Sequence, residues 1–356
     1  MFTSYIIGTG SYVPEVIIPN SDFLHHTFYE REGIPSTKSN ESIIEKFSEI
    51  TGIKERRYAR PDQNASDLGT LAAEAALANA NIDKETLDYI IVAHNFGEVS
   101  INSNRSNFLP SLGSRIKAKL KIENPDCVAY DVPFGCPGWV EALIQANYYI
   151  RSGDAKRCLV IGAETLSRII DPFDRDSMIY SDGAGAVVVE AIEDSNKGIL
   201  AHKTQTHAIQ HAMLLKLGTS FVNDASTQQH LYVKMNGRRV YEFALSHVPL
   251  AIKAALDKAG VSITDVKKVL IHQANEKMDE AILQRLYKLY NIDTVPAAIM
   301  PMTIGWLGNS SVATIPTMLD LILHHKLKDH SIHKGDTVVF ASIGAGMNIN
   351  AIVYRF

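Results

Sequence analysis

The chain has 356 residues, of which 46% are hydrophobic and 21% charged, and its formal net charge is −4 at pH 7. This composition is typical of an ordinary soluble globular protein with a large core, and it excludes a collagen-like or disordered chain. Lysine and arginine are scattered and mixed with acidic residues, so we expect no nucleic-acid partner. No apolar stretch reaches the roughly 18–20 residues of a membrane span, and the N-terminus lacks the basic region of a signal peptide. We therefore expect a cytoplasmic protein without a membrane span.

Three cysteines occur in the chain, at positions 127, 136 and 158, and no CxxC pair is present. An odd number without that spacing argues against a disulfide framework or a zinc site and fits a reducing compartment. Cys127 and Cys158 lie in apolar runs, so we expect both to be inert core residues.

The first half of the chain alternates predicted strands with predicted helices. Residues 5–7 form a first strand, and residues 21–50 are polar and predict a surface excursion. Residues 68–80 are rich in alanine and predict a helix, residues 87–93 form a continuous apolar run typical of a buried strand, and residues 112–120 predict another helix. The alternation favours an α/β protein with a mostly parallel sheet.

Cys136 lies between a predicted strand and a predicted helix in the stretch VAYDVPFGCPGWVE, residues 128–141. Pro137 suits the first turn of a helix over residues 139–150, because its φ is fixed and it has no N–H to leave unpaired. Cys136 then lies at or beside the N-cap, where free amides and the helix dipole favour the thiolate. Such a cysteine is either a nucleophile or a small buried hydrophobe, and this stretch alone does not decide between them.

The second half of the chain repeats features of the first. In the first half, residues 158–162 predict a buried strand, and the glycine-rich segment at residues 181–186 leads into a strand at 187–190. A similar glycine-rich segment recurs at residues 343–354, and His272 ends another apolar strand, in the position that Cys136 occupies in the first half. Two copies of one βαβ-type unit, joined near residues 193–197, would bring equivalent turns together.

Eight short motifs together resemble the β-ketoacyl-acyl carrier protein synthase III family of thiolase-like condensing enzymes. They occur in that family's order over essentially the whole chain: GIKERR at 52–57, the Cys136 turn, DPFDR at 171–175, DGAGA at 182–186, KMNG at 234–237, HQAN at 272–275, GNSSVATIP at 308–316 and GAG at 344–346. One departure is Pro137-Gly138-Trp139, where the family usually has Ala-Gly-Phe. The resemblance implies a five-layer α-β-α-β-α fold built from two pseudo-duplicated halves, residues 1–195 with the nucleophile and residues 196–356 with the other catalytic residues.

The resemblance also implies a catalytic set of Cys136, His272 and Asn309. An acyl group would be held on Cys136 as a thioester, and decarboxylation of a malonyl or β-ketoacyl thioester would supply the attacking carbanion. The Nε2–H of His272 and the side-chain amide of Asn309 would stabilise the enolate oxygen, and the backbone amides of Cys136 and Ala345 would form an oxyanion hole. This chemistry requires no metal and no organic cofactor.

Further expectations from the resemblance concern partners. Leu109 would reach the acyl pocket of the second subunit in a homodimer, and Arg175, Lys277 and Arg285 would lie on the side that receives the phosphopantetheine arm of an acyl carrier protein. The tryptophan and arginine that hold the adenine of CoA in the housekeeping enzyme are replaced by Lys46 and Ile50. We therefore expect loading from a carrier protein in preference to free acyl-CoA.

Other functions remain open at this point. A specialised enzyme that joins two longer acyl or β-ketoacyl units in alkylresorcinol-type secondary metabolism would use the same residues, and the apolar segment at 296–306 would reshape its chain channel. A non-condensing acyltransferase or thioesterase would keep Cys136 without needing the His–Asn pair, and a non-catalytic scaffold would have lost Cys136 or His272. We favour the ketosynthase of fatty acid or related lipid biosynthesis.

Overall fold

Two β-sheets form the frame of the protein in a computed structural model that describes residues 2–222, 224 and 229–356. The first sheet has the strand order β1-β11-β10-β6-β9. Its strands are β1 (Thr3–Tyr12), β6 (Tyr89–His94), β9 (Val128–Pro133), β10 (Arg157–Thr165) and β11 (Asp182–Ile192). Strand β11 runs antiparallel to both β1 and β10, while β10, β6 and β9 are parallel to one another.

The second sheet has the order β12-β17-β16-β15. Its strands are β12 (Gly198–Thr206), β15 (Val266–Ile271), β16 (Thr337–Gly344) and β17 (Asn348–Arg355). Strand β17 is antiparallel to β12 and β16, and β15 is parallel to β16. These directions repeat those of β1, β11, β10 and β6, so the two sheets are built on one plan.

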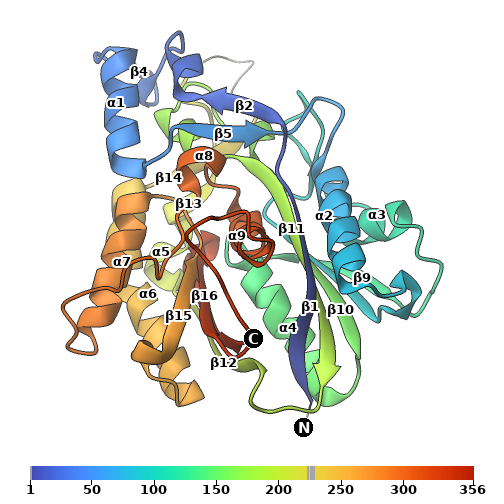
Figure 1. Cartoon of the computed structure of the whole chain (residues 1–356). Helices are drawn as coiled ribbons and strands as arrows, with labels where there is room; N and C mark the ends of the chain where they lie inside the picture. The colour runs from blue at the N-terminus through green and yellow to red at the C-terminus, as the bar shows by residue number, and fades with distance from the viewer. Residues whose placement is uncertain (1, 223, 225–228) are drawn as a thin grey trace.

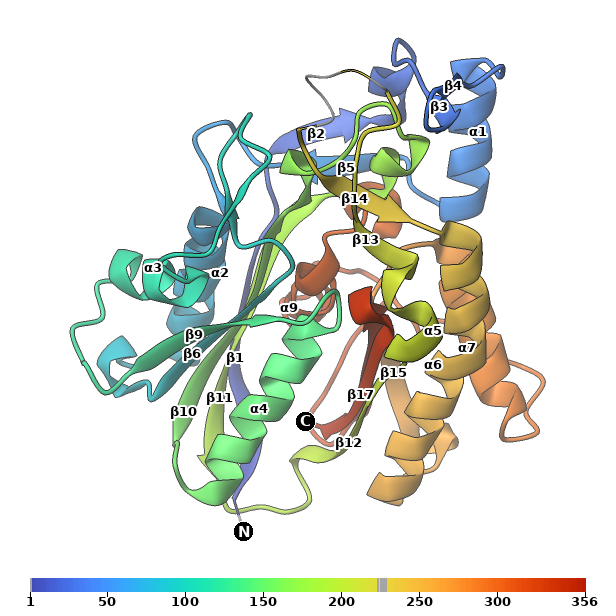
Figure 2. The same cartoon turned by 180° about the vertical axis from the view of Figure 1, so that it is seen from behind.

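Helices form three layers around and between the sheets (Figures 1 and 2). The central layer contains α4 (Gly138–Ser152) and α9 (Thr314–Leu323), which contribute to one core cluster with strands of both sheets. On the outer face of the first sheet lie α2 (Ala65–Ala80) and α3 (Leu112–Lys119), and on the outer face of the second lie α6 (Gly237–Ala259) and α7 (Glu276–Lys288). The α-β-α-β-α arrangement predicted for a thiolase-like protein is thus confirmed.

The central helix α4 is apolar on almost every side because sheets cover it from both directions. Trp139 in its first turn is 1% exposed and makes an edge-to-face contact with Phe340 of β16, with ring centroids 5.9 Å apart. Burying a side chain of this size removes about 150–250 Å² from water, which makes it a main anchor between α4 and the second sheet.

Smaller elements cover one end of the two sheets (Figure 1). Helix α1 (Asn40–Thr51) stands beside the ribbon of β2 (Val16–Pro19) and β5 (Glu55–Tyr58), and β13 (Leu215–Gly218) pairs with β14 (Tyr232–Met235). The remaining short elements are β3 (Tyr29–Arg31), β4 (Ile34–Pro35), β7 (Glu98–Val99), β8 (Ser106–Asn107), α5 (Ala208–His211) and α8 (Ile304–Leu307). No helix in the described part of the chain is long and apolar enough to cross a membrane.

Most elements expected from the sequence are present, and three details differ. The sheets are mixed and not mostly parallel, because β11 and β17 each pair antiparallel with both of their neighbours. The strand predicted at residues 187–190 begins earlier, because residues 182–186 already belong to β11. Glycine is needed there for close packing, since a Cβ on Gly185 would lie 2.7 Å from the backbone nitrogen of Thr317 in α9. His272 does not correspond to Cys136 in the duplicated plan. Strand β15, which precedes His272, occupies the position of β6, and the counterpart of Cys136 is the segment before α9 that carries Asn309.

Candidate active site

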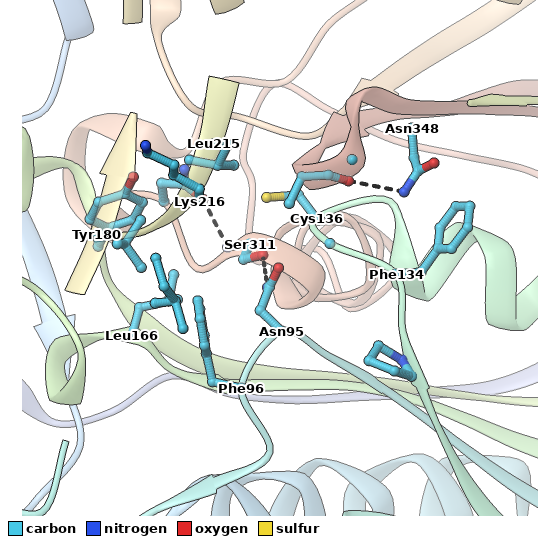
Figure 3. A pocket seen from close by; sticks show the side chains of 17 residues that line it. Asn95, Phe96, Phe134, Cys136, Leu166, Tyr180, Leu215, Lys216, Ser311 and Asn348 are labelled. Carbon is cyan, nitrogen blue, oxygen red and sulfur yellow. Dashed lines mark hydrogen bonds between the residues drawn. The ribbon is translucent and has the colours of Figure 1, made fainter. Parts of the chain in front are cut away.

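The thiol of Cys136 lies in a tight turn between β9 and α4. Gly135 has a φ of 73°, which favours glycine, and α4 begins at Gly138 with Pro137 as its N-cap residue. Cys136 therefore lies immediately before the N-cap, as the sequence predicts. Its side chain lines a cavity of about 350 Å³, and its sulfur points into that cavity (Figure 3).

A second turn, between β16 and β17, packs backbone against backbone on the Cys136 turn. A Cβ on Gly344 would lie 2.6 Å from the backbone nitrogen of Cys136, and a Cβ on Gly135 would lie 2.9 Å from the backbone nitrogen of Ala345. Such distances exclude a side chain at either glycine without a shift of the backbone. The two amides expected to form an oxyanion hole, those of Cys136 and Ala345, therefore belong to turns in direct contact.

Asn309 lines the same cavity as Cys136 and is 4% exposed. Its backbone is held by the segment before β11: its N–H donates to the carbonyl of Ile179, and its own carbonyl accepts from the N–H of Ser181. Its side-chain Oδ1 accepts a hydrogen bond of 2.8 Å from the N–H of Ser311. Because the oxygen is occupied in this way, the NH₂ end of the amide is the part left to donate to a ligand.

His272 follows β15 and is 2% exposed. It does not line the cavity at Cys136, but it interacts with the backbone of Ser311. The hydroxyl of Ser311 in turn hydrogen-bonds the side chain of Cys136. Ser311, which the sequence analysis did not single out, therefore contacts all three predicted catalytic residues.

Burial sets the charge state of the site. It raises the pKa of the Cys136 thiol to about 11, and the hydrogen bond from Ser311 opposes this rise only in part. Burial also lowers the pKa of His272 to about 4. The expectation that the helix terminus favours a resting thiolate is therefore wrong, because the loss of hydration outweighs the dipole at this position. At neutral pH the free site holds a neutral thiol beside a neutral imidazole.

The wall of the cavity opposite the thiol is largely apolar. Leu166, Tyr180, Leu215 and Phe96 line it beside Lys216 (Figure 3), and Val233 is a further lining residue. A cavity of about 350 Å³ is large enough to hold a small ligand beside the thiol. The segment at residues 296–306 contributes no side chain to this lining, so its expected effect on the chain channel is not observed.

The 296–306 segment instead packs beside β15. The side-chain amide of Gln273 donates to the carbonyl of Pro301 at 2.6 Å and accepts from the N–H of Thr303 at 2.9 Å. Ile299 and Ile304 are buried in core clusters. The segment thus supports the residue that follows His272, and the core takes up its apolar side chains.

A larger cavity of about 840 Å³ opens on the side of His272. Ala274 and Asn275, which directly follow the HQ pair, line it together with residues of α1 and α6. Arg175 also lines it, as do Lys46 and Ile50 at the positions where the resemblance places the base-binding tryptophan and arginine. Phe47 is a further lining residue, but its ring packs in two core clusters, with the Arg56 guanidinium 5.9 Å from its centroid.

The remaining predicted site residues lie outside both cavities. Lys277 is exposed at the start of α7, while Arg285 of the same helix donates to the carbonyl of Leu245 at 3.2 Å and is thereby tied to α6. Leu109 is 85% exposed and lines neither cavity of its own chain. Cys127 and Cys158 are buried, as expected for core residues.

Comparison with known proteins agrees with this geometry. Residues 130–208 match the model of 3-oxoacyl-[acyl-carrier-protein] synthase III, and residues 256–356 match the model of its C-terminal part. The chain is 32% identical over 359 residues to the β-ketoacyl-[acyl-carrier-protein] synthase III of Erythrobacter litoralis, with 100% of both chains covered. It belongs to the β-ketoacyl-acyl carrier protein synthase III family.

Solved structures of this family superpose over the whole chain. The 3-oxoacyl-[acyl-carrier-protein] synthase III of Aquifex aeolicus has a TM-score of 0.79 at 32% identity and 100% coverage of both chains. The priming β-ketosynthase of the R1128 polyketide pathway has a TM-score of 0.81 at 25% identity, with 99% of this chain and 96% of that chain covered. The fold is therefore shared with a synthase III and with a priming ketosynthase of a polyketide pathway.

Proposed function

We propose that the protein catalyses a decarboxylating Claisen condensation between an acyl group held on Cys136 and a malonyl thioester on acyl carrier protein. The observation that carries this proposal is the convergence of Cys136, His272 and Asn309 on Ser311, beside a cavity of acyl-chain size. The product is a β-ketoacyl thioester, and the enzyme is an acyltransferase of fatty acid or related lipid biosynthesis.

The first half-reaction transfers the acyl group. The sulfur of Cys136 attacks the donor thioester carbonyl, the donor sulfur leaves as a thiol after taking up a proton, and the backbone amides of Cys136 and Ala345 bind the transient oxyanion. Because the resting thiol has a pKa of about 11, its proton must leave during the attack. The departing donor sulfur takes up a proton as it leaves, so proton loss and proton uptake balance within this step.

The second half-reaction forms the C–C bond. Cleavage of the bond to the carboxylate of the malonyl group releases CO₂ and leaves the electron pair in an enolate, which attacks the acyl carbonyl and expels the Cys136 thiolate. The enolate oxygen needs neutral donors, and the lowered pKa of His272 keeps its imidazole neutral. Asn309 supplies the second donor through the amide end that its bond to Ser311 leaves available. The proposal invokes no metal and no organic cofactor.

The cavity between α1 and α6 is the proposed path of the phosphopantetheine arm. It is lined by Ala274 and Asn275, one and two residues beyond Gln273, and its rim includes the cationic side chain of Arg175. We assign the exposed Lys277 to the docking surface for the carrier protein, with a smaller role for Arg285. We further propose a cytoplasmic homodimer, in which the exposed Leu109 enters the acyl cavity of the partner subunit. Each chain would consist of two halves divided near residue 195.

A second candidate function is the joining of two longer acyl or β-ketoacyl units in secondary metabolism. The similarity to a priming β-ketosynthase of a polyketide pathway supports it, as does the presence of two cavities, one lined by Cys136 and Asn309 and the other by the residues that follow Gln273. The two functions differ in the extender unit but not in the roles of Cys136, His272 and Asn309.

Product analysis tests the proposal and separates the two candidates. The purified protein is given an acyl carrier protein loaded with a short acyl chain, and either malonyl- or β-ketoacyl-carrier protein as extender. We expect a β-ketoacyl product from the malonyl extender, and its loss in His272→Ala and Asn309→Ala. Product from the β-ketoacyl extender alone would favour the second candidate, and no product from either would refute both.

A further inference from the structure

A chain of hydrogen bonds leads from the catalytic thiol into the first sheet. Asn95 follows β6 and Glu164 lies on the neighbouring strand β10. The side-chain nitrogen of Asn95 lies 2.8 Å from the hydroxyl of Ser311 (Figure 3). The same nitrogen lies 2.6 Å from Oε2 of Glu164. The backbone N–H of Asn95 also donates to Oε2 at 2.8 Å. None of these three residues was predicted from the sequence as part of the site.

Glu164 determines which end of the Asn95 amide faces the site. Oε2 of Glu164 already accepts the backbone N–H of Asn95, so this oxygen acts as an acceptor and binds the NH₂ end of the side-chain amide, which excludes the reverse orientation. Glu164 is 1% exposed, and no ion pair links it to a lysine or arginine among the described residues. Its hydrogen bonds to Asn95 therefore account for much of its stabilisation in a buried position.

The amide orientation in turn directs the hydroxyl of Ser311. Both hydrogens of the Asn95 NH₂ group are used, one for Glu164 and one for Ser311 Oγ. Because Oγ accepts from Asn95, the single hydrogen of Ser311 is free to point at the sulfur of Cys136, with which its side chain interacts. Ser311 has a φ of 54°, an uncommon value for a residue with a side chain, which is consistent with placement for a specific contact.

We propose that Asn95 and Glu164 are positioning residues that hold the Ser311 hydroxyl as a hydrogen-bond donor to the sulfur of Cys136, and that this donor stabilises the thiolate whenever it forms. The titratable groups around Cys136 are Glu164 from β10, Tyr180 before β11 and His272 after β15, and the cationic Lys216 of β13 lines the same cavity. When Glu164 is ionised, its negative charge destabilises the Cys136 thiolate, and the hydrogen bond from Ser311 opposes this effect.

The test is the pH dependence of Cys136 alkylation, which needs no acyl substrate and is therefore independent of the proposed reaction. The rate with iodoacetamide follows the thiolate fraction. Ser311→Ala keeps the backbone contacts to His272 and Asn309 and removes the hydroxyl donor. We expect its alkylation midpoint to rise by about one pH unit, and its rate at neutral pH to fall about tenfold. Ser311→Gly, which suits the positive φ, should give the same shift in a chain that folds at least as well.

A double-mutant cycle shows whether Asn95 acts through Ser311. Asn95→Ala alone should raise the midpoint by a smaller amount, and the double variant Asn95→Ala/Ser311→Ala should shift it no further than Ser311→Ala alone. The matched control is Ser4→Ala, since Ser4 is a buried serine bonded to Asn147 at 3.1 Å, 11 residues along α4 from the site. An unchanged midpoint in both Ser311 variants, or fully additive shifts in the double variant, would overturn the proposal.

Discussion

Gly344 and Cys136 are in such close contact that a methyl group on Gly344 would lie 2.6 Å from the backbone nitrogen of Cys136. The φ of Gly344 is −171°, which alanine adopts readily, so the clash alone opposes a substitution. We predict that Gly344→Ala displaces the Cys136 amide and slows acylation of Cys136 by at least about tenfold, because displacements near 1 Å can cost about a hundredfold in catalysis. Intact-protein mass spectrometry over time measures this rate.

The control for this variant is Gly183→Ala. Gly183 is buried in β11, but a Cβ there would meet its nearest neighbour at an ordinary 3.5 Å. Its acylation rate should stay close to that of the unmodified protein. Equal rates in Gly344→Ala and Gly183→Ala would show that the contact between the two turns does not position the oxyanion hole.

Glu164 should make the stability of the protein depend on pH near neutrality. Burial raises its pKa from 4.5 to about 7, so the folded state retains the proton more tightly than the unfolded state does. This stabilisation is fully present below pH 4.5 and is lost as the pH rises through 7, a change of about 3 kcal/mol. Glu164→Gln cannot titrate, so the unmodified protein should lose stability relative to this variant between about pH 5 and pH 8.

Urea unfolding at a series of pH values tests this prediction. The quantity of interest is the difference in unfolding free energy between Glu164→Gln and the unmodified protein, because other titrating groups cancel in it. A difference that stays constant from pH 5 to pH 8 would mean that Glu164 titrates near its ordinary value in the folded protein.

The acyl donor should be a carrier protein and not free CoA. Lys46 and Ile50 line the cavity between α1 and α6, where a stacking platform for adenine would be needed, and the Phe47 ring is packed into the core. Loss of a stacked base is expected to weaken CoA binding by about 1–3 kcal/mol, or roughly ten- to a hundredfold. Loading of Cys136 from matched acyl-carrier and acyl-CoA donors, with Cys136→Ala as the control, measures the preference. Equal or faster loading from micromolar acetyl-CoA would refute it.

Charge reversal on α7 tests the carrier surface. Lys277 is exposed and Arg285 is tied to the carbonyl of Leu245, so Lys277→Glu should raise the KM for carrier-bound substrate more than Arg285→Glu does. The salt dependence of kcat/KM should become weaker in Lys277→Glu, because electrostatic steering is screened by salt. Kinetics identical to those of the unmodified protein at low salt would identify Lys277 as an ordinary solvated residue.

The layers of the fold and the place of the nucleophile could be predicted because they follow local patterns. The apolar runs of β6 and β10, the helix after Pro137 and the family motifs around Cys136 are all contiguous in the sequence. Arg56 shows the limit of such patterns. It lies in the charged run Lys54–Arg57, which gives no sign of burial, yet it is fully buried and donates to the carbonyls of Ile18 and Met178.

The residues behind the catalytic set could not be predicted, because no contiguous sequence pattern contains them. Asn95, Glu164 and Ser311 come from three separate segments, and their roles depend on contacts that form only when two sheets and α9 are packed together. One signal was present, since a carboxylate at the end of the apolar run of β10 has to find a buried partner. The charge state of Cys136 was mispredicted because burial, which a sequence pattern does not show, outweighs the helix dipole.

The most direct test of the account is a single-turnover measurement on Cys136. The protein is first acylated by acyl-carrier protein, freed of donor, and then mixed with malonyl-carrier protein while the intact mass, the released CO₂ and the products are followed. The account predicts that the acyl mass on Cys136 disappears as an equal amount of β-ketoacyl-carrier protein and CO₂ is formed, and that Asn309→Ala is acylated but not discharged. Failure of Cys136 to take up the acyl group, or its discharge as a free acid without CO₂, would contradict it.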